Sequence, residues 1–504
     1  MAERHPKGFL DSRRQDIGYR DVVVRVQDFD EIHAPQWHEG TLRTQGRRCM
    51  DCGVPTCMGG CPIANLVPEW NDLVSRGRWR EALDRLHATN NFPEFTGYTC
   101  PAPCEPACVL ALDDEAVTIK SIERAIVDRG WDAGWIVPEP PARRTGYRVA
   151  VVGSGPAGLS AAQQLNRAGH LVTVYERDDV IGGLMTYGIP DFKFAKHRVA
   201  RRVRQLEAEG IEFRTGRVVG RDPTLPALRA EYNAVCLALG ALKARDLDVP
   251  GRELRGIELA MPYLVQENRR QAGLAVREQA IVATDRRVVV LGGGDTGADC
   301  VATAHRQGAA SVTQVDVNVM CPRRRPADNP WPEPPVTHER SYAQAEGSVD
   351  LYGFETLTFE STADGSTVAA VCGQRVTWTY TRRRRRLEKA VMAGNARIPA
   401  DLVLIAAGFL GPEVEPFGGA LELTDAGTLR AGPDMQTNVP GVFAAGDAAM
   451  GQSIVVWAIG EGRDAARAID TYLTGSSSLP ASLRTHNAPT QWCIERAEGI
   501  RDTP

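Results

Sequence analysis

Seven cysteines near the N-terminus have the residue type and spacing of metal-ligating thiolates. They form two groups, which are Cys49, Cys52, Cys57 and Cys61, then Cys100, Cys104 and Cys108. Prolines within or directly after each group keep the backbone out of regular helices. Thiolates at short spacing on irregular loops are typical of iron–sulfur ligation. The remaining cysteines among the 12 are isolated, and we expect them to be ordinary thiols (Cys236, Cys300, Cys321, Cys372 and Cys493).

Disulfides, a zinc site and a reduced structural set are the alternatives for these cysteines. The odd number of thiols and the lack of an apolar signal segment at the N-terminus disfavour disulfides. Structural zinc uses paired C-x2-C units, and only Cys49 and Cys52 form one. Seven thiolates do not fill two four-ligand clusters. Either one cluster has a non-cysteine ligand, or the chain holds a single cluster.

A glycine-rich turn predicts a dinucleotide-binding site farther along the chain. Its residues are Gly153, Ser154, Gly155, Pro156, Ala157 and Gly158, a G-x-G-x-x-G motif. An apolar strand precedes the motif, a helical pattern follows it, and a second strand over 171–175 ends on Glu176. The glycines permit a tight turn, approach of a pyrophosphate and close helix–strand packing. The helix N-terminus faces the phosphates, and the terminal acid can accept from ribose hydroxyls.

Two further segments favour FAD as the nucleotide of this first motif. A glycine pair ending at Gly183 and followed by Leu184 comes shortly after the acid. A later strand ends on Ala-Gly-Asp, at Gly446 and Asp447, directly before a helix. An aspartate in that position can bond a flavin ribityl or phosphate hydroxyl. We therefore expect the C-terminal part of the chain to return to the first nucleotide domain.

A second G-x-G-x-x-G motif follows another apolar strand. Its residues are Gly292, Gly294, Asp295, Thr296 and Gly297. Alignment of the two motifs places Asp316 at the position of Glu176, and an acid there favours NADH. The arginine run that begins at Arg323 could instead hold the 2′-phosphate of NADPH, so NADH and NADPH both stay open. Two dinucleotide sites in one chain indicate that one cofactor reduces another, with a duplicated scaffold as the alternative.

Composition places the chain among ordinary globular proteins. It has 504 residues, 43% hydrophobic and 24% charged, with a net charge of −4. This charge predicts no attraction to nucleic acid or to an anionic membrane. No apolar run reaches the roughly 18 residues of a transmembrane helix. Cytoplasmic localisation is the expectation, since thiols stay reduced there.

The predicted fold class is α/β, with two Rossmann-like dinucleotide-binding domains preceded by a helical iron–sulfur domain. We expect the NAD(P)H domain to be inserted in the FAD domain, with the buried strand at 401–408 leading back to the first sheet. Residues 382–386 are expected at a solvated hairpin tip, with a partner-docking patch as the alternative. The predicted boundaries are 1–145 for the [4Fe–4S] domain, 146–283 and 401–480 for the FAD domain, 284–400 for the NAD(P)H domain and 481–504 for a polar tail.

These motifs together resemble the small (β) subunit family of glutamate synthase. The shared pattern is the paired cysteine loops, GSGPAG, GGGDTGADC, DNPWPE and NVPGVFAAGD, and it covers nearly the whole chain. The electron-input half of dihydropyrimidine dehydrogenase is similar in layout. The resemblance implies two [4Fe–4S] clusters. One would be held by Cys49, Cys52, Cys57 and Cys108, and the other by Cys61, Cys100, Cys104 and Glu123, which stands where the dehydrogenase has a glutamine ligand.

The resemblance also implies the reaction. In this family the small subunit oxidises NAD(P)H through FAD and passes electrons through its clusters to a large (α) subunit that carries FMN and a [3Fe–4S] cluster. That subunit makes L-glutamate from L-glutamine and 2-oxoglutarate. We assign no catalytic residue to this chain, because hydride passes from cofactor to cofactor. The alternative is a stand-alone NAD(P)H oxidoreductase that feeds a ferredoxin, a quinone or a pyrimidine-reducing partner.

Overall fold

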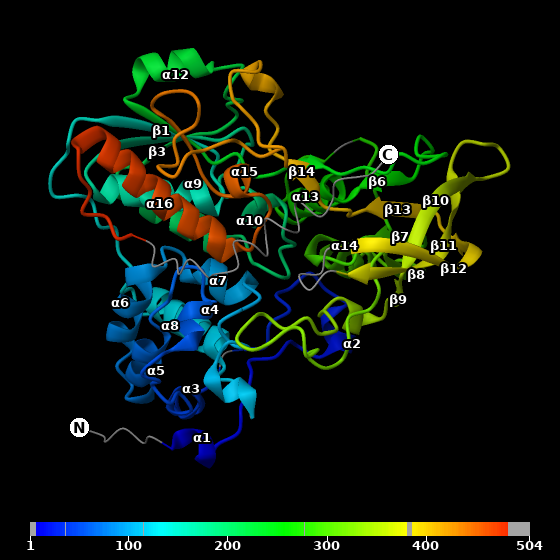
Figure 1. The fold of residues 1–504 in the computed structure, drawn as a ribbon, viewed down its shortest axis with the longest axis horizontal. Helices are drawn as coiled ribbons and strands as arrows, with labels where there is room; N and C mark the ends of the chain where they lie inside the picture. Colours follow the sequence, from blue (N-terminus) through cyan, green and yellow to red (C-terminus); the bar gives the residue numbers. More distant parts are fainter. Residues whose placement is uncertain (1–6, 36, 114, 277, 381–385, 482–504) are drawn as a thin grey trace.

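The computed structural model describes residues 7–35, 37–113, 115–276, 278–380 and 386–481. Figure 1 shows three parts, with the N-terminal helices below one parallel sheet and beside a second. None of the helices in these ranges is long and apolar enough to cross a membrane. The N-terminal helices are α1 (Gly8–Asp11), α2 (Val22–Arg25), α3 (Glu39–Arg47), α4 (Thr56–Gly60), α5 (Val67–Ser75), α6 (Trp79–Thr89), α7 (Pro93–Thr99), η1 (Val109–Leu112) and α8 (Ile119–Asp132).

The N-terminal helices pack around their own apolar core, which includes Trp70, Leu86 and Ile122. The cysteines lie in the loops and at the helix ends between them. Two of these helices, α5 and α6, follow each other closely along the chain. Gly77 separates them with a φ of +74°, a backbone conformation that glycine adopts readily and other residues rarely do.

The first parallel sheet has the strand order β15-β4-β1-β2-β3. Its strands are β1 (Arg148–Val152), β2 (Leu171–Tyr175), β3 (Glu212–Arg214), β4 (Ala234–Leu237) and β15 (Val442–Ala444). Its helices are α9 (Pro156–Arg167), α10 (Leu184–Tyr187), α11 (His197–Ala208), α12 (Leu225–Glu231), α15 (Asp447–Met450) and α16 (Val455–Thr474). Because β15 pairs with β4 in parallel, the C-terminal part of the chain does return to this sheet.

The second parallel sheet has the strand order β6-β13-β7-β8-β9. Its elements are β6 (Ile257–Leu259), α13 (Ala260–Gln271), β7 (Arg287–Leu291), α14 (Asp295–Arg306), β8 (Ser311–Asp316), η2 (Gln344–Glu346), β9 (Val349–Tyr352) and β13 (Leu402–Ile405). This corrects one expectation, because the strand within 401–408 pairs with β6 and β7 and does not join the first sheet. The segment 257–271, which we expected in the FAD domain, belongs to the second sheet as well.

An antiparallel sheet of β10 (Phe354–Ser361), β11 (Val368–Tyr380) and β12 (Arg386–Pro399) extends from the second domain. The expected hairpin tip lies outside the described residues except for Arg386, and so does the tail after 481. A ribbon of β5 (Lys243–Ala244) and β14 (Phe409–Gly411) joins the two nucleotide domains, and η3 (Glu415–Phe417) follows it. Two segments thus connect the nucleotide domains.

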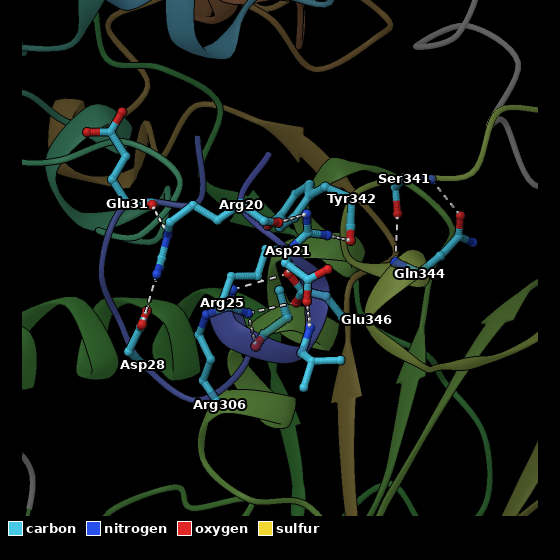
Figure 2. Close-up of polar contacts among 12 residues, drawn as sticks. Arg20, Asp21, Arg25, Asp28, Glu31, Arg306, Ser341, Tyr342, Gln344 and Glu346 are labelled. Carbon is cyan, nitrogen blue, oxygen red and sulfur yellow. Dashed lines mark hydrogen bonds and ion pairs between the residues drawn. The ribbon is translucent and has the colours of Figure 1, made fainter. Parts of the chain in front are cut away.

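The N-terminal segment around α2 lies against the second nucleotide domain, far from the other N-terminal helices (Figure 1). Arg25 Nε donates to Glu346 Oε1 at 2.7 Å, and Arg306 Nη1 donates to Glu346 Oε2 at 2.7 Å. All three side chains are buried, and Figure 2 shows them converging between α2, α14 and η2. Loss of one partner would leave a buried charge uncompensated, so this network fixes the segment on the second domain.

The helical domain is attached to the first nucleotide domain by a second buried ion pair. Arg202 on α11 donates to both carboxylate oxygens of Glu94 on α7, at 2.6 and 2.8 Å. Both side chains are almost fully buried. Bidentate pairing fixes orientation as well as distance. The cysteine-bearing helices therefore have a defined position on the first nucleotide domain.

Candidate electron-transfer site

The first glycine loop has no room for side chains at two of its positions. A Cβ on Gly153, whose φ is +103°, would lie 2.2 Å from Ala238 O. A Cβ on Gly158 would lie 1.9 Å from Gly153 O. At Gly155 nothing lies within 4 Å of such a Cβ. The loop is therefore tight on its inner side and open at Gly155, which is the side on which a pyrophosphate would approach the N-terminus of α9.

Glu176 lies at the end of β2, beside this loop. Its Oε2 accepts from Ser154 N at 3.0 Å and from Ser154 Oγ at 2.6 Å. Its Oε1 accepts from Asp178 N at 2.9 Å. These bonds hold the buried carboxylate next to the glycine loop, and a ribose would lie beside this carboxylate when its phosphates face α9.

Two other predicted segments converge on the same loop. A Cβ on Gly183 would lie 3.0 Å from Gly155 Cα, and a Cβ on Gly446 would lie 2.7 Å from the Cβ of Ala157. The N-termini of α10, which begins at Leu184, and of α15 thus meet the first loop, and Pro156 begins α9. The residues predicted to bind FAD therefore surround one narrow cradle. At Gly183 and Gly446 this cradle leaves no room for a Cβ atom.

Asp447 begins α15 and is held in place by Ser453. Its Oδ1 accepts from Ser453 N at 3.2 Å and from Ser453 Oγ at 3.0 Å. Burial raises the pKa of Asp447 to about 7. Ser453 lies two residues before α16, so the aspartate is linked to the start of the helix that also faces the cysteines.

The second glycine loop repeats this construction. A Cβ on Gly292 would lie 2.2 Å from Ala406 O, one on Gly297 would lie 2.2 Å from Gly292 O, and Gly294 is open. Asp316 Oδ2 would lie 2.1 Å from a Cβ on Gly293, so this acid lies at the loop as Glu176 does at the first. Asp295 and Thr296 form the first turn of α14. The structure therefore brings these predicted residues together, on the second sheet.

Arg323 lies in the irregular segment after β8, and its side chain is exposed. Within the described ranges, Arg323 makes no hydrogen bond or ion pair with the second glycine loop. Its neighbour Arg325 is engaged instead, since its Nη1 donates to Glu333 O at 2.7 Å. The arrangement leaves Arg323 directed to solvent, where a 2′-phosphate could reach it.

Four of the seven N-terminal cysteines, which form the first cluster group, line one pocket in the helical domain. The cysteines in its wall are Cys49, Cys52, Cys57 and Cys108. Burial raises the pKa of the Cys49 thiol to about 11, and the nearby Asn71 amide opposes this effect. Burial also raises the pKa of Cys52 and Cys57. Protons do not leave such thiols readily near neutral pH, so a bound cationic iron centre is what would convert them to thiolates.

The remaining three cysteines face Glu123 on α8. The negative charge of this carboxylate adds to burial in raising the pKa of Cys61, Cys100 and Cys104. Glu123 Oε1 accepts from Thr96 Oγ1 at 2.7 Å and from Asn90 Nδ2 at 3.1 Å, and burial raises its pKa to about 7. Both of these hydrogen bonds reach Oε1. Oε2 is thus the oxygen available as a fourth ligand.

The three cysteines that face Glu123 lie against the first nucleotide domain. Cys61 and Cys100 belong to one apolar cluster with Val456 of α16. A Cβ on Gly460 of the same helix would lie 3.0 Å from Ile63 Cγ2. The helix that starts beside Asp447 therefore packs directly on Cys61 and Cys100, while Cys57 and Cys108 belong to the core of the helical domain with Trp70 and Ile122.

The donor sets fit iron–sulfur clusters better than single ions. In the part of the chain that the structure describes, no three His, Cys, Asp or Glu side chains converge closely enough to hold one metal ion. A cluster separates its ligands by its own width, whereas mononuclear zinc draws them together. The described cysteines are all free thiols, so disulfides do not form there.

Sequence reasoning missed two features of the site. Lys193 Nζ donates to Asp299 Oδ1 at 2.7 Å and joins the two nucleotide domains. Asn71 of α5 lines the first cysteine cavity. Neither Lys193 nor Asn71 belongs to a motif, and Lys193 is far from Asp299 in the sequence. A single lysine in a turn, or a single asparagine in a helix, carries no signal that distinguishes it from a surface residue.

Comparisons with known proteins give the same division of the chain. The family described as dihydropyrimidine dehydrogenase domain II, 4Fe-4S cluster, matches residues 25–135. The family described as pyridine nucleotide-disulphide oxidoreductase matches residues 147–330 and 359–467. The structure of Mycobacterium tuberculosis FprA in complex with NADPH is 18% identical, with a TM-score of 0.51 over 67% of this chain and 88% of that chain. These matches confirm the predicted fold class.

Curated relatives match nearly the full chain. The glutamate synthase [NADPH] small chain of Mycobacterium tuberculosis (strain ATCC 25618 / H37Rv) is 49% identical over 495 residues, which is 96% of this chain and 99% of the relative. The protein of the same name in Bacillus subtilis (strain 168) is 47% identical over 493 residues, or 94% of this chain and 99% of the relative. The glutamate synthase [NADH] of Schizosaccharomyces pombe (strain 972 / ATCC 24843) is 45% identical over 487 residues, and the match covers 23% of that longer protein.

Proposed function

Because this chain belongs to the glutamate synthase small-chain family, we propose that it is the electron-input subunit of a glutamate synthase. It takes hydride from NAD(P)H and delivers electrons to a large subunit that forms L-glutamate from L-glutamine and 2-oxoglutarate. The observation that carries this proposal is the packed contact between the flavin cradle and the cysteine loops. Val456 and Gly460 of α16 pack on the Cys61 group, and the same helix begins next to Asp447.

The chain's own residues bind and orient the cofactors. The first glycine loop, Glu176, Gly183, Leu184, Gly446 and Asp447 hold FAD. The second loop with Asp316 holds the nicotinamide nucleotide, and Arg323 takes the 2′-phosphate when the donor is NADPH. When bound, FAD accepts hydride and passes on single electrons, which iron–sulfur clusters require. The protein supplies no acid or base to this step, so position and exclusion of water are its contributions.

The two cysteine groups define the order of electron transfer. The group of Cys61, Cys100, Cys104 and Glu123 lies against α16 and is the nearer acceptor. The group of Cys49, Cys52, Cys57 and Cys108 lies in the helical domain and is the farther one. Cys52 is partly exposed, so the farther group reaches the surface on which a large subunit docks. We propose that this subunit carries FMN and a [3Fe–4S] cluster and that the complex is cytoplasmic.

Coexpression with the large subunit tests the proposed function. We expect the two chains to copurify and to form L-glutamate from L-glutamine and 2-oxoglutarate only when NAD(P)H is present. Gly155→Ala in the small chain is the matched control, because it fills the open side of the flavin cradle and leaves the docking surface unchanged. Copurification without nucleotide-dependent glutamate formation would contradict the proposal. Reduction of a ferredoxin or quinone by the chain alone, with no large subunit bound, would favour the stand-alone oxidoreductase.

A further inference from the structure

A buried amide lines the cavity between the first group of cysteines. Asn71 lies on α5 and is 0% exposed. Neither Nδ2 nor Oδ1 has a hydrogen-bond partner among the described residues. A buried polar group without a partner costs about 1–3 kcal/mol, and such groups are few in folded proteins. The amide therefore faces the cavity without a protein partner and has a free donor to offer to what fills the space.

The helix packing places this amide next to a ligand. A Cβ on Gly46 of α3 would lie 2.9 Å from the backbone oxygen of Asn71, so glycine is needed for α3 and α5 to approach at this point. Cys49 follows directly, and its backbone N donates to Gly46 O at 3.2 Å. The contact between two helices thus fixes Asn71 and Cys49 on the same wall of the cavity.

The rest of the cavity wall offers little competing polarity. Its lining is mostly apolar and includes Val67, Leu110 and Ile119. Thr56 is the other uncharged polar side chain that lines it, and the Thr56 hydroxyl already donates to Ala107 O at 2.6 Å. Asn71 is therefore the side chain whose N–H groups are available to an occupant.

We propose that Asn71 Nδ2 donates a hydrogen bond to a sulfur of the cluster held by Cys49, Cys52, Cys57 and Cys108 and so raises the reduction potential of that cluster. The inference rests on the proposed function, because it requires a cluster in this cavity. Reduction adds negative charge to the cluster, and a hydrogen bond to a more negative acceptor is stronger. Hydrogen bonds to sulfur are among the determinants of cluster potential. The bond makes the farther cluster a better acceptor of electrons that arrive from the Cys61 group.

A redox titration of the purified holoprotein, followed by electron paramagnetic resonance, tests this role. Asn71→Leu removes the donor at similar volume. We expect the equilibrium constant for reduction of one cluster to fall about tenfold, a shift of about 59 mV to more negative potential for a one-electron couple. The other cluster is the internal control and keeps its midpoint. Glu123→Gln shows which signal belongs to the control cluster, because it changes the midpoint of the cluster held by Cys61, Cys100 and Cys104.

Asn71→Asp is the second variant, since an ionised carboxylate has the shape of the amide but no donor. It decides the question if Asn71→Leu fails to fold, and we expect its midpoint to shift in the same direction. Unchanged midpoints, or equal shifts of both clusters, would overturn the inference. Loss of the cluster from both variants would overturn it as well, because a tuning bond does not hold the iron. A wild-type protein without cluster signals would instead overturn the proposed function.

Discussion

The Lys193 ammonium group lies 2.7 Å from Asp299 Oδ1, and this ion pair joins the first nucleotide domain to α14 of the second. Tyr342 donates its hydroxyl to the same oxygen at 2.7 Å. Phe192 and Phe194 flank the lysine, and their side chains pack into different cores. Phe192 lies in the core of the second domain and Phe194 in that of the first. The short segment around Lys193 therefore sets the position of one nucleotide site relative to the other.

The first prediction concerns this ion pair. Asp299→Asn removes the carboxylate that is bonded to the buried Lys193 ammonium, and breaking a buried pair costs about 3–5 kcal/mol. We expect a lower urea midpoint together with slower reduction of the flavin by NAD(P)H in rapid mixing. Arg287→Gln is the control, because its partner Asp401 is exposed and such pairs contribute about 0–1 kcal/mol. Equal effects of the two substitutions would contradict the role of the pair.

The two open glycines give a second, paired prediction. Gly155→Ala adds a methyl group that meets no protein atom but lies where the FAD pyrophosphate approaches, so we expect a folded protein with little flavin. Gly294→Ala does the same at the second loop, and we expect it to keep its flavin but to raise the KM for NAD(P)H at least about tenfold. Flavin content after denaturation and steady-state kinetics measure the two effects. Flavin loss from Gly294→Ala would reverse our assignment of the two loops.

The third prediction concerns Glu123. Two [4Fe–4S] clusters correspond to about eight irons per chain. Glu123→Ala removes the only carboxylate that faces Cys61, Cys100 and Cys104 in the described part of the chain with an oxygen to spare, so we expect about four irons to remain. Glu123→Gln keeps an oxygen ligand and should retain about eight. Anaerobic purification followed by iron analysis measures both. An alanine variant with the full iron content would show that Glu123 is not a ligand.

Acid sensitivity gives a fourth prediction. Burial lowers the pKa of His33 to about 4, and Arg124 and Lys120 add to this effect while Glu31 opposes it. The folded state thus holds His33 neutral, whereas the unfolded chain binds a proton below about pH 6.5. This contribution to stability is complete above the unfolded pKa and is lost as the pH falls toward the folded pKa. From about pH 7.5 to about pH 5.5 the loss is about 1 kcal/mol.

His33→Gln tests this source of acid sensitivity. We expect the variant to lose less of its free energy of unfolding over the same pH interval than the wild type does. Urea unfolding at the two pH values, with both proteins in parallel, provides the comparison. His87 is also buried with a lowered pKa and stays unchanged in both proteins, so it cancels from the difference. An equal pH dependence of the two proteins would exclude His33.

Local motifs made much of the site predictable from the sequence. Strand, glycines, helix and terminal acid are consecutive, so the positions of Gly153 to Glu176 and of Gly292 to Asp316 follow from one stretch each. The assignment of Cys108 to the same cluster as Cys49, Cys52 and Cys57 required resemblance to a known family. Spacing alone does not show which loops meet in space. The proposal of Glu123 as a ligand rests on the same resemblance, since one glutamate in a helix has no pattern of its own.

The errors in the expected fold have a physical origin. A strand buried on both faces is apolar throughout, so 401–408 shows no sign of which sheet it joins. The structure places it between β6 and β7, and the domain boundary moves with it. The Lys193–Asp299 pair and the Asn71 amide depend on contacts between distant segments. Such contacts follow only from the packed structure.

Anaerobic titration of the purified chain with NADPH and, separately, with NADH tests the central claim most directly. The flavin absorption band and the cluster resonances are followed together as nucleotide is added. The relay predicts that one nucleotide bleaches the flavin band and that cluster signals of reduced iron appear in the same chain, without any large subunit. A flavin that bleaches while both clusters stay oxidised at every nucleotide concentration, or a flavin that neither nucleotide bleaches, would contradict it.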